Sequence, residues 1–497
     1  MNKLVSVVPD QGQEAASPGK LYYGGKWHPS ADGGQIQVHN PANLAHLANV
    51  EQAGATDLNS AVAAAKAGQA EWKKTKPLQR TQAIREAARR IRENKAELAL
   101  LDAMDSGNPL KGMEFDVELG ATLMEFFAGL ATEIKGETIP SGDGQVNYVT
   151  REPVGVVARL VPFNHPLMFA CAKIAAPIVA GNAVILKPSE ETPLSALRMT
   201  ELIGDLFPAG VLNVLNGGRE LGEAIARHPG IANVSLIGSV NTGKAVMQGA
   251  ASTLKRMSLE LGGKNALIVF PDADVDGAIA GAVKGMNLGW TAGQSCGSTS
   301  RVLVHDDHYE ALVEGIGDAF EAVRLGDPAR ADTEMGCLSS RSQFDKVNKY
   351  VALAREEGAR QVAGGEAGMQ GQLANGYFVR PTLFADVTPQ MRIAREEVFG
   401  PVLSVLRWSD YEEMIETANG VELGLTASIW TRDLDTALRT VSDIHAGYVW
   451  VNNSSDHFLG APFGGVGQSG IGREECLEEL LSYTEQKNVN ITIAPGR

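Results

Sequence analysis

The sequence predicts an α/β protein with two largely parallel sheets. Its 497 residues exceed what one hydrophobic core organises, so two or three domains are expected. Short apolar runs alternate with helical patterns in two successive stretches, one starting at Gly155 and one at Ala266. Continuous apolar runs of this kind are typical of strands that are buried on both faces, as in parallel sheets covered by helices.

The part before Gly155 is predicted to be mainly helical. Residues 1–19 hold only a five-residue apolar run, which is too short for a secretory signal, so we interpret them as a loose leader. Residues 55–104 have apolar positions at helical spacing and predict two amphipathic helices broken near Pro77. Residues 113–135 predict another helix, and residues 145–151 predict an extended segment.

The first strand–helix alternation extends from residue 156 to residue 251. Such a sheet binds dinucleotides at the carboxyl ends of its strands. The predicted strands are 156–161, 183–186, 211–215 and 234–237, and the predicted helices are 167–179, 192–206, 221–226 and 242–251.

The second alternation extends from Ala266 to about Leu459, and we place a domain boundary at residues 260–264. Its clearest predicted strands are 266–270, 301–304, 402–407 and 448–452. The last stretch, 481–493, ends in an alternating polar–apolar pattern that is typical of a strand. We interpret this strand either as an oligomer contact or as an edge strand within the same subunit.

Composition excludes several function classes. A formal net charge of −15 repels phosphate backbones, so nucleic acid is not an expected partner. Free thiols indicate a reducing compartment such as the cytoplasm. The most apolar stretch, residues 174–186, is too short to cross a bilayer, so no membrane association is expected. Neither a metal site nor a disulfide framework is expected, because the cysteines are far apart: Cys171, Cys296, Cys337 and Cys476.

Cys296 is the strongest candidate for a nucleophile. It follows Ser295 in a Gly-Gln-Ser-Cys-Gly segment after a predicted helix over 273–289, which predicts an accessible loop. A thiol is a strong nucleophile near neutral pH, and small neighbours leave room for a substrate carbon. The local sequence is equally compatible with a buried structural thiol, the role that we assign to the other three cysteines.

Glu260 and Asn164 are candidates for acid–base and oxyanion roles. Glu260 follows an apolar run and precedes two glycines, so it is either a buried general base or a solvated turn residue. Asn164 lies between two prolines at a predicted strand end, where a rigid amide either donates to an oxyanion or merely forms a turn. His165 has no acidic neighbour in sequence to orient it, and we do not expect it to act as a base.

Two segments have the character of a dinucleotide site. Lys187 and Glu190 follow the predicted strand 183–186, where they reach ribose hydroxyls, and the acid favours NAD over the 2′-phosphate of NADP. Residues 238–243, which include Ser239, join a predicted strand to a predicted helix. A Gly-rich turn at a helix N-terminus fits a pyrophosphate.

Together and in this order, these segments resemble the aldehyde dehydrogenase superfamily. The resemblance extends from about Leu21 to Ile493 and includes the loops 207–213, 376–382, 396–401 and 462–473. It implies two Rossmann-like parallel-sheet domains and a small β extension for assembly as a homodimer or homotetramer. The implied division is 20–135 and 152–260 with a return segment 465–480 for cofactor binding, 261–464 for catalysis, and 136–151 with 481–497 for oligomerisation.

The resemblance implies a hydrolytic, NAD(P)-dependent aldehyde dehydrogenase acting on a small-molecule aldehyde. Cys296 is then the nucleophile that forms a thiohemiacetal and a thioester, and Glu260 activates the hydrolytic water. Asn164 and the backbone N–H of Cys296 hold the oxyanion. NAD is the expected cofactor and NADP the alternative. The implied cofactor contacts are Lys187, Glu190, Ser239, Pro162, Phe163, Gly238, Gly243, Leu261, Glu397 at the nicotinamide ribose and Phe399 at the nicotinamide ring.

The sequence departs from the family pattern mainly around the substrate. Glu260 and Cys296 are 36 residues apart, two more than usual, and the extra length lies near residues 288–292. Phe163 stands where the family usually has Trp, residues 236–237 replace the usual Phe-Thr, and Ala172 replaces a frequent bulky aromatic. We expect an apolar or aromatic aldehyde. The candidate tunnel residues are Met168, Phe169, Ala172, Trp290, Ser295, His457 and Phe458.

Other functions remain as alternatives. A CoA-acylating relative transfers the acyl group to CoA, but such relatives typically lack the base, so Glu260 argues against this function. A betaine-aldehyde or semialdehyde dehydrogenase is a narrower alternative, and Ala172 weakens an aromatic cage for a quaternary ammonium. A non-catalytic binding protein on the same fold is disfavoured by the presence of Cys296, Glu260 and Asn164.

Overall fold

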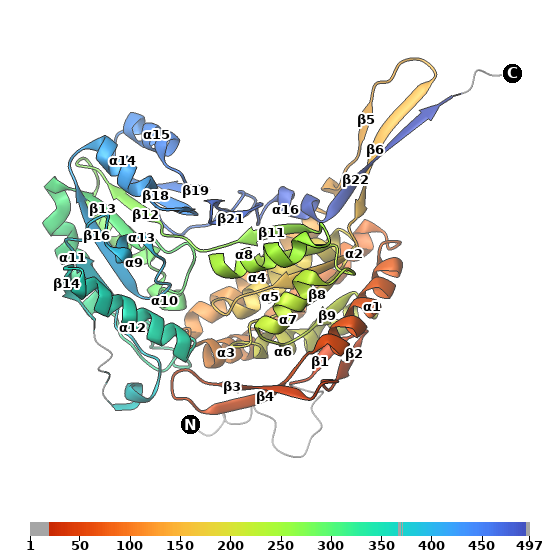
Figure 1. The fold of residues 1–497 in the computed structure, drawn as a ribbon, viewed down its shortest axis with the longest axis horizontal. Coiled ribbons are helices and arrows are strands. Elements are labelled where there is room, and N and C mark those ends of the chain that lie inside the picture. The colour runs from red at the N-terminus through yellow and green to blue at the C-terminus, as the bar shows by residue number, and fades with distance from the viewer. Residues whose placement is uncertain (1–18, 366–368, 370, 494–497) are drawn as a thin grey trace.

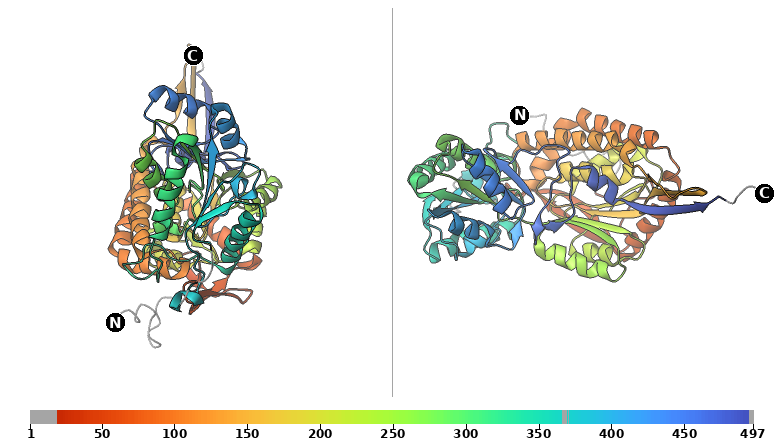
Figure 2. Two further views of the ribbon diagram at one scale, coloured as in Figure 1. Left: turned by 90° about the vertical axis from the view of Figure 1, so that its left-hand side faces the viewer. Right: turned by 90° about the horizontal axis from the view of Figure 1, so that it is seen from above.

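The computed structural model describes residues 19–365, 369 and 371–493. Two large sheets form two lobes, and a narrow three-stranded sheet projects from one of them (Figures 1 and 2). The predicted α/β class with two largely parallel sheets is thereby confirmed. Residues 1–18 of the expected leader and 494–497 of the expected oligomerisation segment lie outside the described residues.

The first sheet contains a reversal of strand order. Across it lie β2 (Lys26–His28), β1 (Leu21–Tyr23), β9 (Leu212–Val214), β8 (Ala183–Lys187), β7 (Val156–Leu160), β10 (Asn233–Ile237), β11 (Arg256–Glu260) and β21 (Gly470–Ile471). The strands from β9 to β11 run parallel, and the outer strands are antiparallel. The chain order β7–β8–β9 extends to one side of β7, whereas β10 pairs on its other side. Such a reversal leaves a crevice at the carboxyl ends of the strands.

The second sheet is also mainly parallel. Across it lie β14 (Arg360–Ala363), β15 (Thr382–Ala385), β16 (Val402–Trp408), β13 (Arg301–His305), β12 (Ala266–Val269), β18 (Thr426–Trp430) and β19 (Tyr448–Val451). Only β14 is antiparallel to its neighbour. The chain passes from the first sheet to the second through residues 261–265, between β11 and β12.

The projecting sheet, which we call the arm, combines two distant parts of the chain. It consists of β5 (Glu137–Ile139), β6 (Gln145–Pro153) and β22 (Thr484–Thr492). β22 pairs antiparallel with β6 along its whole length, so it is an edge strand of neither large sheet. The arm extends away from both lobes in every view (Figures 1 and 2).

The helices cover both faces of the two large sheets (Figure 1). Residues 55–104 form three helices instead of the predicted two, because Asn94 (φ −107°, ψ 20°) interrupts the helical backbone between α2 and α3. The small antiparallel pairs are β3 (Gly34–His39) with β4 (His46–Gln52) and β17 (Leu423–Gly424) with β20 (Val466–Gly467). The helices are α1 (Ala55–Trp72), α2 (Pro77–Glu93), α3 (Lys95–Ser106), α4 (Leu110–Gly129), α5 (Pro166–Val179), α6 (Leu194–Ile203), α7 (Arg219–Arg227), α8 (Val240–Ala251), α9 (Val275–Gly285), α10 (Leu288–Thr291), α11 (Tyr309–Glu321), α12 (Arg341–Glu356), α13 (Arg392–Arg395), α14 (Tyr411–Asn419), α15 (Leu434–Asp443) and α16 (Leu477–Ser482), with 3₁₀ turns at Ala131–Glu133, Gly204–Leu206, Asp306–His308 and Gly371–Asn375.

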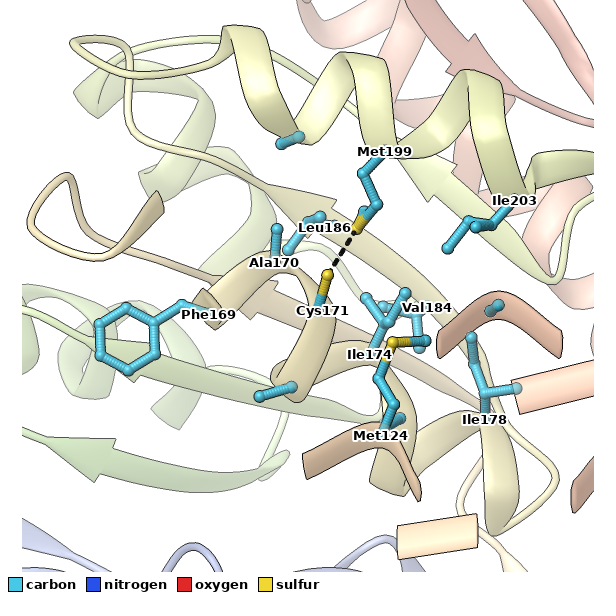
Figure 3. Packing of buried hydrophobic residues seen from close by; sticks show 14 of the residues in the cluster. Met124, Phe169, Ala170, Cys171, Ile174, Ile178, Val184, Leu186, Met199 and Ile203 are labelled. Carbon is cyan, nitrogen blue, oxygen red and sulfur yellow. Dashed lines mark hydrogen bonds between the residues drawn. The ribbon is translucent and has the colours of Figure 1, made fainter. Parts of the chain in front are cut away.

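Helix α5 is buried on all sides and forms the centre of the first core. The thiol of Cys171 lies 3.6 Å from the sulfur of Met199 on α6, among Ile174 and strand residues such as Val184 (Figure 3). Phe169 on the same helix extends away from this cluster (Figure 3). Helix α5 therefore places Cys171 in the core and Phe169 on another side.

Two buried aspartates of α3 hold the first turns of α5 and α6. Asp102 accepts a hydrogen bond from the backbone N–H of Leu167 (3.0 Å), and Asp105 accepts one from Leu194 (3.1 Å). These N–H groups have no partner within their own helices, so the carboxyl groups satisfy them. Burial raises the pKa of Asp102 to about 7 and that of Asp105 well above its ordinary value.

Neither a membrane-spanning helix nor a metal cluster is found in the part of the chain that the structure describes. Within residues 19–365, 369 and 371–493, no helix is long and apolar enough to cross a membrane. In the same ranges, no three side chains of His, Cys, Asp or Glu gather in a way that would hold a metal ion. The four cysteines are free thiols; Cys296 is half-buried and the other three are buried.

Replacing Asp102 by Asn should change how stability depends on pH. The folded chain keeps a proton on Asp102 that the unfolded chain releases, between pH 3.8 and about 7, so the free energy of unfolding falls as the pH rises through this window. Asn keeps an oxygen for the Leu167 N–H but does not titrate. Asp102→Asn should therefore gain stability relative to the wild type between pH 5 and pH 7, by at most about 1.4 kcal/mol per pH unit.

Calorimetric melting temperatures at several pH values measure this difference. Asp143→Asn serves as the control, because Asp143 lies exposed in the loop of the arm. A difference between Asp102→Asn and wild type that stays constant with pH contradicts the account.

Candidate active site

A cavity of about 1010 Å³ lies between the two lobes and contains the predicted nucleophile and the predicted base. Cys296 and Glu260 both line it. The first lobe contributes residues of α4 and α5, and the second contributes α9, α10 and the loop that carries Cys296. These two side chains, 36 positions apart in sequence, therefore share one enclosed space.

Cys296 lies in a loop shaped by α10 and the left-handed residues beside it. Asn287 (φ 54°) and Ala292 (φ 51°) bracket α10, and the extra length that the family resemblance implies is expected in this segment. The side chain of Asn265 donates to the carbonyl oxygen of Cys296 (2.7 Å) and fixes the loop from below. Burial, and after it the carboxyl groups of Glu397 and Glu260, raise the pKa of the Cys296 thiol to about 12.

Glu260 ends β11 with its carboxyl group buried and without hydrogen bonds. It is 4% exposed, and neither of its carboxyl oxygens has a partner among the described residues. Burial, and after it the nearby Glu474 carboxylate, raise the pKa of Glu260 well above its ordinary value. A Cβ at Gly464 would lie 2.8 Å from Oε1 of Glu260, so a glycine there gives the carboxyl group its space.

A buried group of charges lies behind Glu260. Glu474 pairs with Lys173 of α5 (2.8 Å) and with Arg159 of β7 (2.8 Å). Burial raises the pKa of Glu474, but Lys173 and Arg159 outweigh it and lower the pKa below its ordinary value. Lys173 and Arg159 thus favour the ionised form of Glu474, whereas burial and the Glu474 carboxylate favour the protonated form of Glu260.

The predicted oxyanion donor Asn164 lies at the start of α5, next to the cavity. The side chain of Asn108 donates to the backbone oxygen of Asn164 (2.8 Å) and fixes this residue. Asn164 is 3% exposed, and its side-chain oxygen has no hydrogen-bond partner among the described residues. Asn164 itself does not line the cavity, whereas the following residue, His165, does.

Five of the seven candidate tunnel residues line the cavity, and two do not. Ala172 has no exposed surface and lies in the core of the first lobe, because its side of α5 faces other helices. Phe458 is 76% exposed and lies outside the cavity. These two residues therefore do not line the cavity in this structure. The candidates that line the cavity are Met168, Phe169, Trp290, Ser295 and His457.

His165 has an acidic partner that sequence reasoning missed. Its Nδ1 lies 2.8 Å from Oδ2 of Asp116, a fully buried residue of α4. The indole Nε1 of Trp290 donates to Oδ1 of the same carboxylate (2.7 Å). Asp116 precedes His165 by 49 residues, and Trp290 follows Asp116 by 174, so nothing local in the sequence signals this contact.

The predicted pyrophosphate segment lies at the reversal of strand order. Pro162 and Phe163 follow β7, and Gly238 and Ser239 follow β10, so both pairs lie at the crevice between these strands. The Ser239 hydroxyl caps α8 by accepting from the Thr242 N–H (3.2 Å). Among the remaining predicted contacts, a Cβ at Gly243 would lie 2.7 Å from the side chain of Leu261, so these two pack closely together.

The other predicted cofactor residues flank this crevice. The Lys187 ammonium lies 3.4 Å from the Glu190 carboxylate at the end of β8. Phe399 adopts φ +59°, a costly conformation for a bulky residue, and its ring meets that of Phe163 edge to face at 5.8 Å. Glu397 accepts a hydrogen bond from the Gly263 N–H (3.0 Å). The loop of the second lobe thus reaches the first lobe at the mouth of the crevice.

Comparisons with known proteins agree on one family. Residues 27–489 match the model of the aldehyde dehydrogenase family. Aldehyde dehydrogenase tropH from Talaromyces stipitatus is 48% identical over 482 residues, which cover 95% of this chain and 93% of that protein.

Solved structures show the same likeness along the whole chain. PnpE, from Pseudomonas sp. WBC-3, was solved in complex with nicotinamide adenine dinucleotide; it has a TM-score of 0.94 and 39% identity, covering 97% of this chain and 99% of that one. The NAD⁺ complex of aldehyde dehydrogenase from Bacillus cereus has a TM-score of 0.93 and 39% identity, covering 96% and 97%. The chain therefore belongs to the aldehyde dehydrogenase family and is an oxidoreductase of that class.

Proposed function

We propose that the chain oxidises an aldehyde to a carboxylic acid with NAD, through a thiohemiacetal and a thioester on Cys296 that water hydrolyses. The observation that carries this proposal is the shared cavity, which is lined both by Cys296 and by Glu260, an acid whose carboxyl oxygens have no hydrogen-bond partner among the described residues. A nucleophile and a general base beside the same space are what acyl formation and hydrolysis require.

The residues of the chain divide the chemistry between them. The thiol of Cys296 loses its proton to solvent as its sulfur attacks the aldehyde carbon, and the side chain of Asn164 and the backbone N–H of Cys296 donate to the oxygen that becomes an alkoxide. Loss of one such donor typically costs about 3 kcal/mol of transition-state stabilisation. NAD, held by the residues of the crevice between β7 and β10, would supply the hydride acceptor. Glu260 then takes a proton from the water that attacks the thioester carbon, and the acid leaves with the sulfur restored as a thiol.

The crevice between β7 and β10 suits the proposed cofactor. The Gly-Ser turn at the start of α8 lies beside it, and the N-terminus of a helix favours a pyrophosphate. The buried Lys187 and the partly exposed Glu190 lie at the end of the adjacent strand, within reach of ribose hydroxyls. The NAD complexes of the two solved relatives support NAD for this chain as well. NADP is the alternative, which the Glu190 carboxylate disfavours.

Hydrolysis is favoured over transfer of the acyl group to CoA. The presence of a buried Glu260 without hydrogen bonds, in the same cavity as the nucleophile, supports a base that activates water.

We infer a cofactor-binding domain formed by 20–135 and 152–260 with the return segment 465–480, and a catalytic domain formed by 261–464. The position of β21, which returns to pair with β11, supports this division. The four free thiols support a cytoplasmic location.

We also infer that the chain assembles as a homodimer or homotetramer through the arm. Val146 and Ile491 lie directly opposite each other in the β6–β22 register, with Tyr148 and Val489 next to them on the same face. Val146 is 39% exposed and Ile491 is 43% exposed. A three-stranded sheet that stands away from the core gains stability by burying such a face.

Replacing Glu260 by Gln should separate the two halves of the reaction. Gln keeps the size of the side chain but accepts no proton, so NADH should form in a burst of about one per active site. Steady-state turnover should then fall by roughly 100-fold or more. Cys296→Ala should show no burst, whereas Cys337→Ala, which removes a buried thiol elsewhere, should behave like the wild type. Stopped-flow NADH fluorescence measures both phases, and an unchanged steady-state rate in Glu260→Gln removes this residue as the base.

Replacing Glu190 by Gln should relax the preference for NAD. The substitution keeps the size but removes the charge that repels the 2′-phosphate of NADP. The ratio of kcat/KM for NADP to that for NAD should rise by about tenfold or more, equivalent to about 1.4 kcal/mol. Glu191→Gln removes the neighbouring charge and should change the ratio less. An unchanged ratio in Glu190→Gln shows that this carboxylate does not select the cofactor.

Charges on the apolar face of the arm should break the assembly. Val146→Lys combined with Ile491→Lys places two like charges opposite each other on that face. The molar mass measured by light scattering after gel filtration should fall to that of a smaller assembly. Gln145→Lys with Thr492→Lys makes the same change at the adjacent pair, on the opposite face, and should keep the mass. Retention of the full mass by the first variant excludes this face as the interface.

A further inference from the structure

The buried carboxylate of Asp116 determines which nitrogen of His165 is free. Its two oxygens face two donors, the Nδ1 of His165 at 2.8 Å and the Nε1 of Trp290 at 2.7 Å. Indole Nε1 only donates, and an ionised carboxylate only accepts. The proton of a neutral His165 ring therefore lies on Nδ1. Its Nε2 is left as a hydrogen-bond acceptor.

His165 belongs to one wall of the cavity. His165 lines the cavity together with Phe115, Met168, Phe169 and Trp290, all of which are apolar or aromatic. The rings of Trp290 and Phe169 meet the imidazole edge to face, at 4.7 and 5.5 Å, and hold its plane. Among the described residues, Nε2 has no hydrogen-bond partner in the structure. It is thus a polar atom in an otherwise apolar stretch of wall.

Three pairs of ionisable side chains that also line the cavity are, in contrast, paired with each other. Lys284 pairs with Asp456 at 2.6 Å, and both side chains are about half exposed. His457 pairs with Glu475 at 3.1 Å. Another pair, Arg324 with Glu334 at 2.8 Å, is likewise exposed. Each of these six groups already has a partner, so the pairs offer a substrate little that water does not already offer.

We propose that His165 is a specificity-determining residue that accepts a hydrogen bond, through Nε2, from a hydroxyl group on the aldehyde substrate. Asp116 is the positioning residue that sets the acceptor character of this nitrogen, and Trp290 fixes Asp116. The inference rests on the proposed aldehyde oxidation and deepens it, because it names hydroxyaldehydes, aliphatic or phenolic, as the preferred class. An apolar pocket alone distinguishes poorly between a methyl and a hydroxyl group, whereas a site built to bond a hydroxyl discriminates strongly.

Matched aromatic aldehydes test the proposal. The 2-, 3- and 4-hydroxybenzaldehydes are compared with the methyl and methoxy analogues at the same positions, with the acid product measured by chromatography. For the wild type, kcat/KM should favour the hydroxyl compound over its methyl analogue by about fivefold or more at one position at least. The methoxy compound, which only accepts hydrogen bonds, should show no such gain.

Substitution of His165 should remove the preference. His165→Phe keeps a flat ring without an acceptor, so the ratio of hydroxyl to methyl should fall to about one while methyl aldehydes are still oxidised. If this variant keeps the wild-type ratio, His165 does not bind the hydroxyl group. If wild-type enzyme with NAD oxidises none of the aldehydes, the proposed function itself fails, which is a different result.

Asp116→Asn supplies the second, independent variant. Its amide oxygen accepts from Trp290, and its amide nitrogen then donates to Nδ1 of His165, so the ring proton moves to Nε2. The nitrogen that faces the cavity becomes a donor, and the methoxy aldehydes should gain at least about threefold relative to their methyl analogues. A merely structural role for Asp116 lowers activity toward all three classes equally, and that result overturns the proposal.

Discussion

Both carboxyl oxygens of Glu260 are buried and have no hydrogen-bond partner among the described residues. Leaving a buried polar group unpaired typically costs about 1–3 kcal/mol, so the surrounding fold has to stabilise this arrangement. Burial raises the pKa of Glu260 and that of the Cys296 thiol, which are held near one another in one cavity. Burial thus favours the uncharged form of both groups, and a substrate or a water molecule in the cavity offers each of them a new partner.

The rest of the first lobe supports this buried pair. Strand β11 carries Glu260 to the junction of the lobes, and Gly464 leaves space for its carboxyl group. Behind it, Lys173 and Arg159 neutralise Glu474, which keeps this second buried acid ionised next to the first. On the other side of the cavity, Asp102 holds the first turn of α5, the helix that begins beside Asn164 and His165. Positioning of the site thus depends on several buried acids with different partners.

Much of the fold could be predicted from local patterns. The continuous apolar runs at 156–161 and 183–186 became the buried strands β7 and β8, because a strand covered on both faces leaves a readable signal. The sequence analysis did not predict strand β11 or the helix break at Asn94. Neither feature changes the pattern of apolar residues on which the prediction of strands and helices rests. Ala172 was misplaced because sequence alone does not say which side of a fully buried helix faces a cavity.

The residues of the site could likewise be predicted only where the local sequence carries a signal. Cys296 and Glu260 stood out through their small, glycine-rich neighbours, and they line one cavity. Asp116 gave no such signal: it lies in the middle of an ordinary helix, and its partners His165 and Trp290 are far away in sequence. Contacts of this kind depend on the packing of three separate elements.

Covalent attachment of the substrate to Cys296 is the central claim, and intact-mass spectrometry of Glu260→Gln protein mixed with an aldehyde and NAD tests it most directly. After one round of NADH formation, the account predicts a mass increase equal to the acyl group minus one hydrogen. Peptide mapping should locate this increase on Cys296, and it should be absent when NAD is omitted. NADH formation with no change in the mass of the protein, or with the acyl group on another residue, would contradict the account.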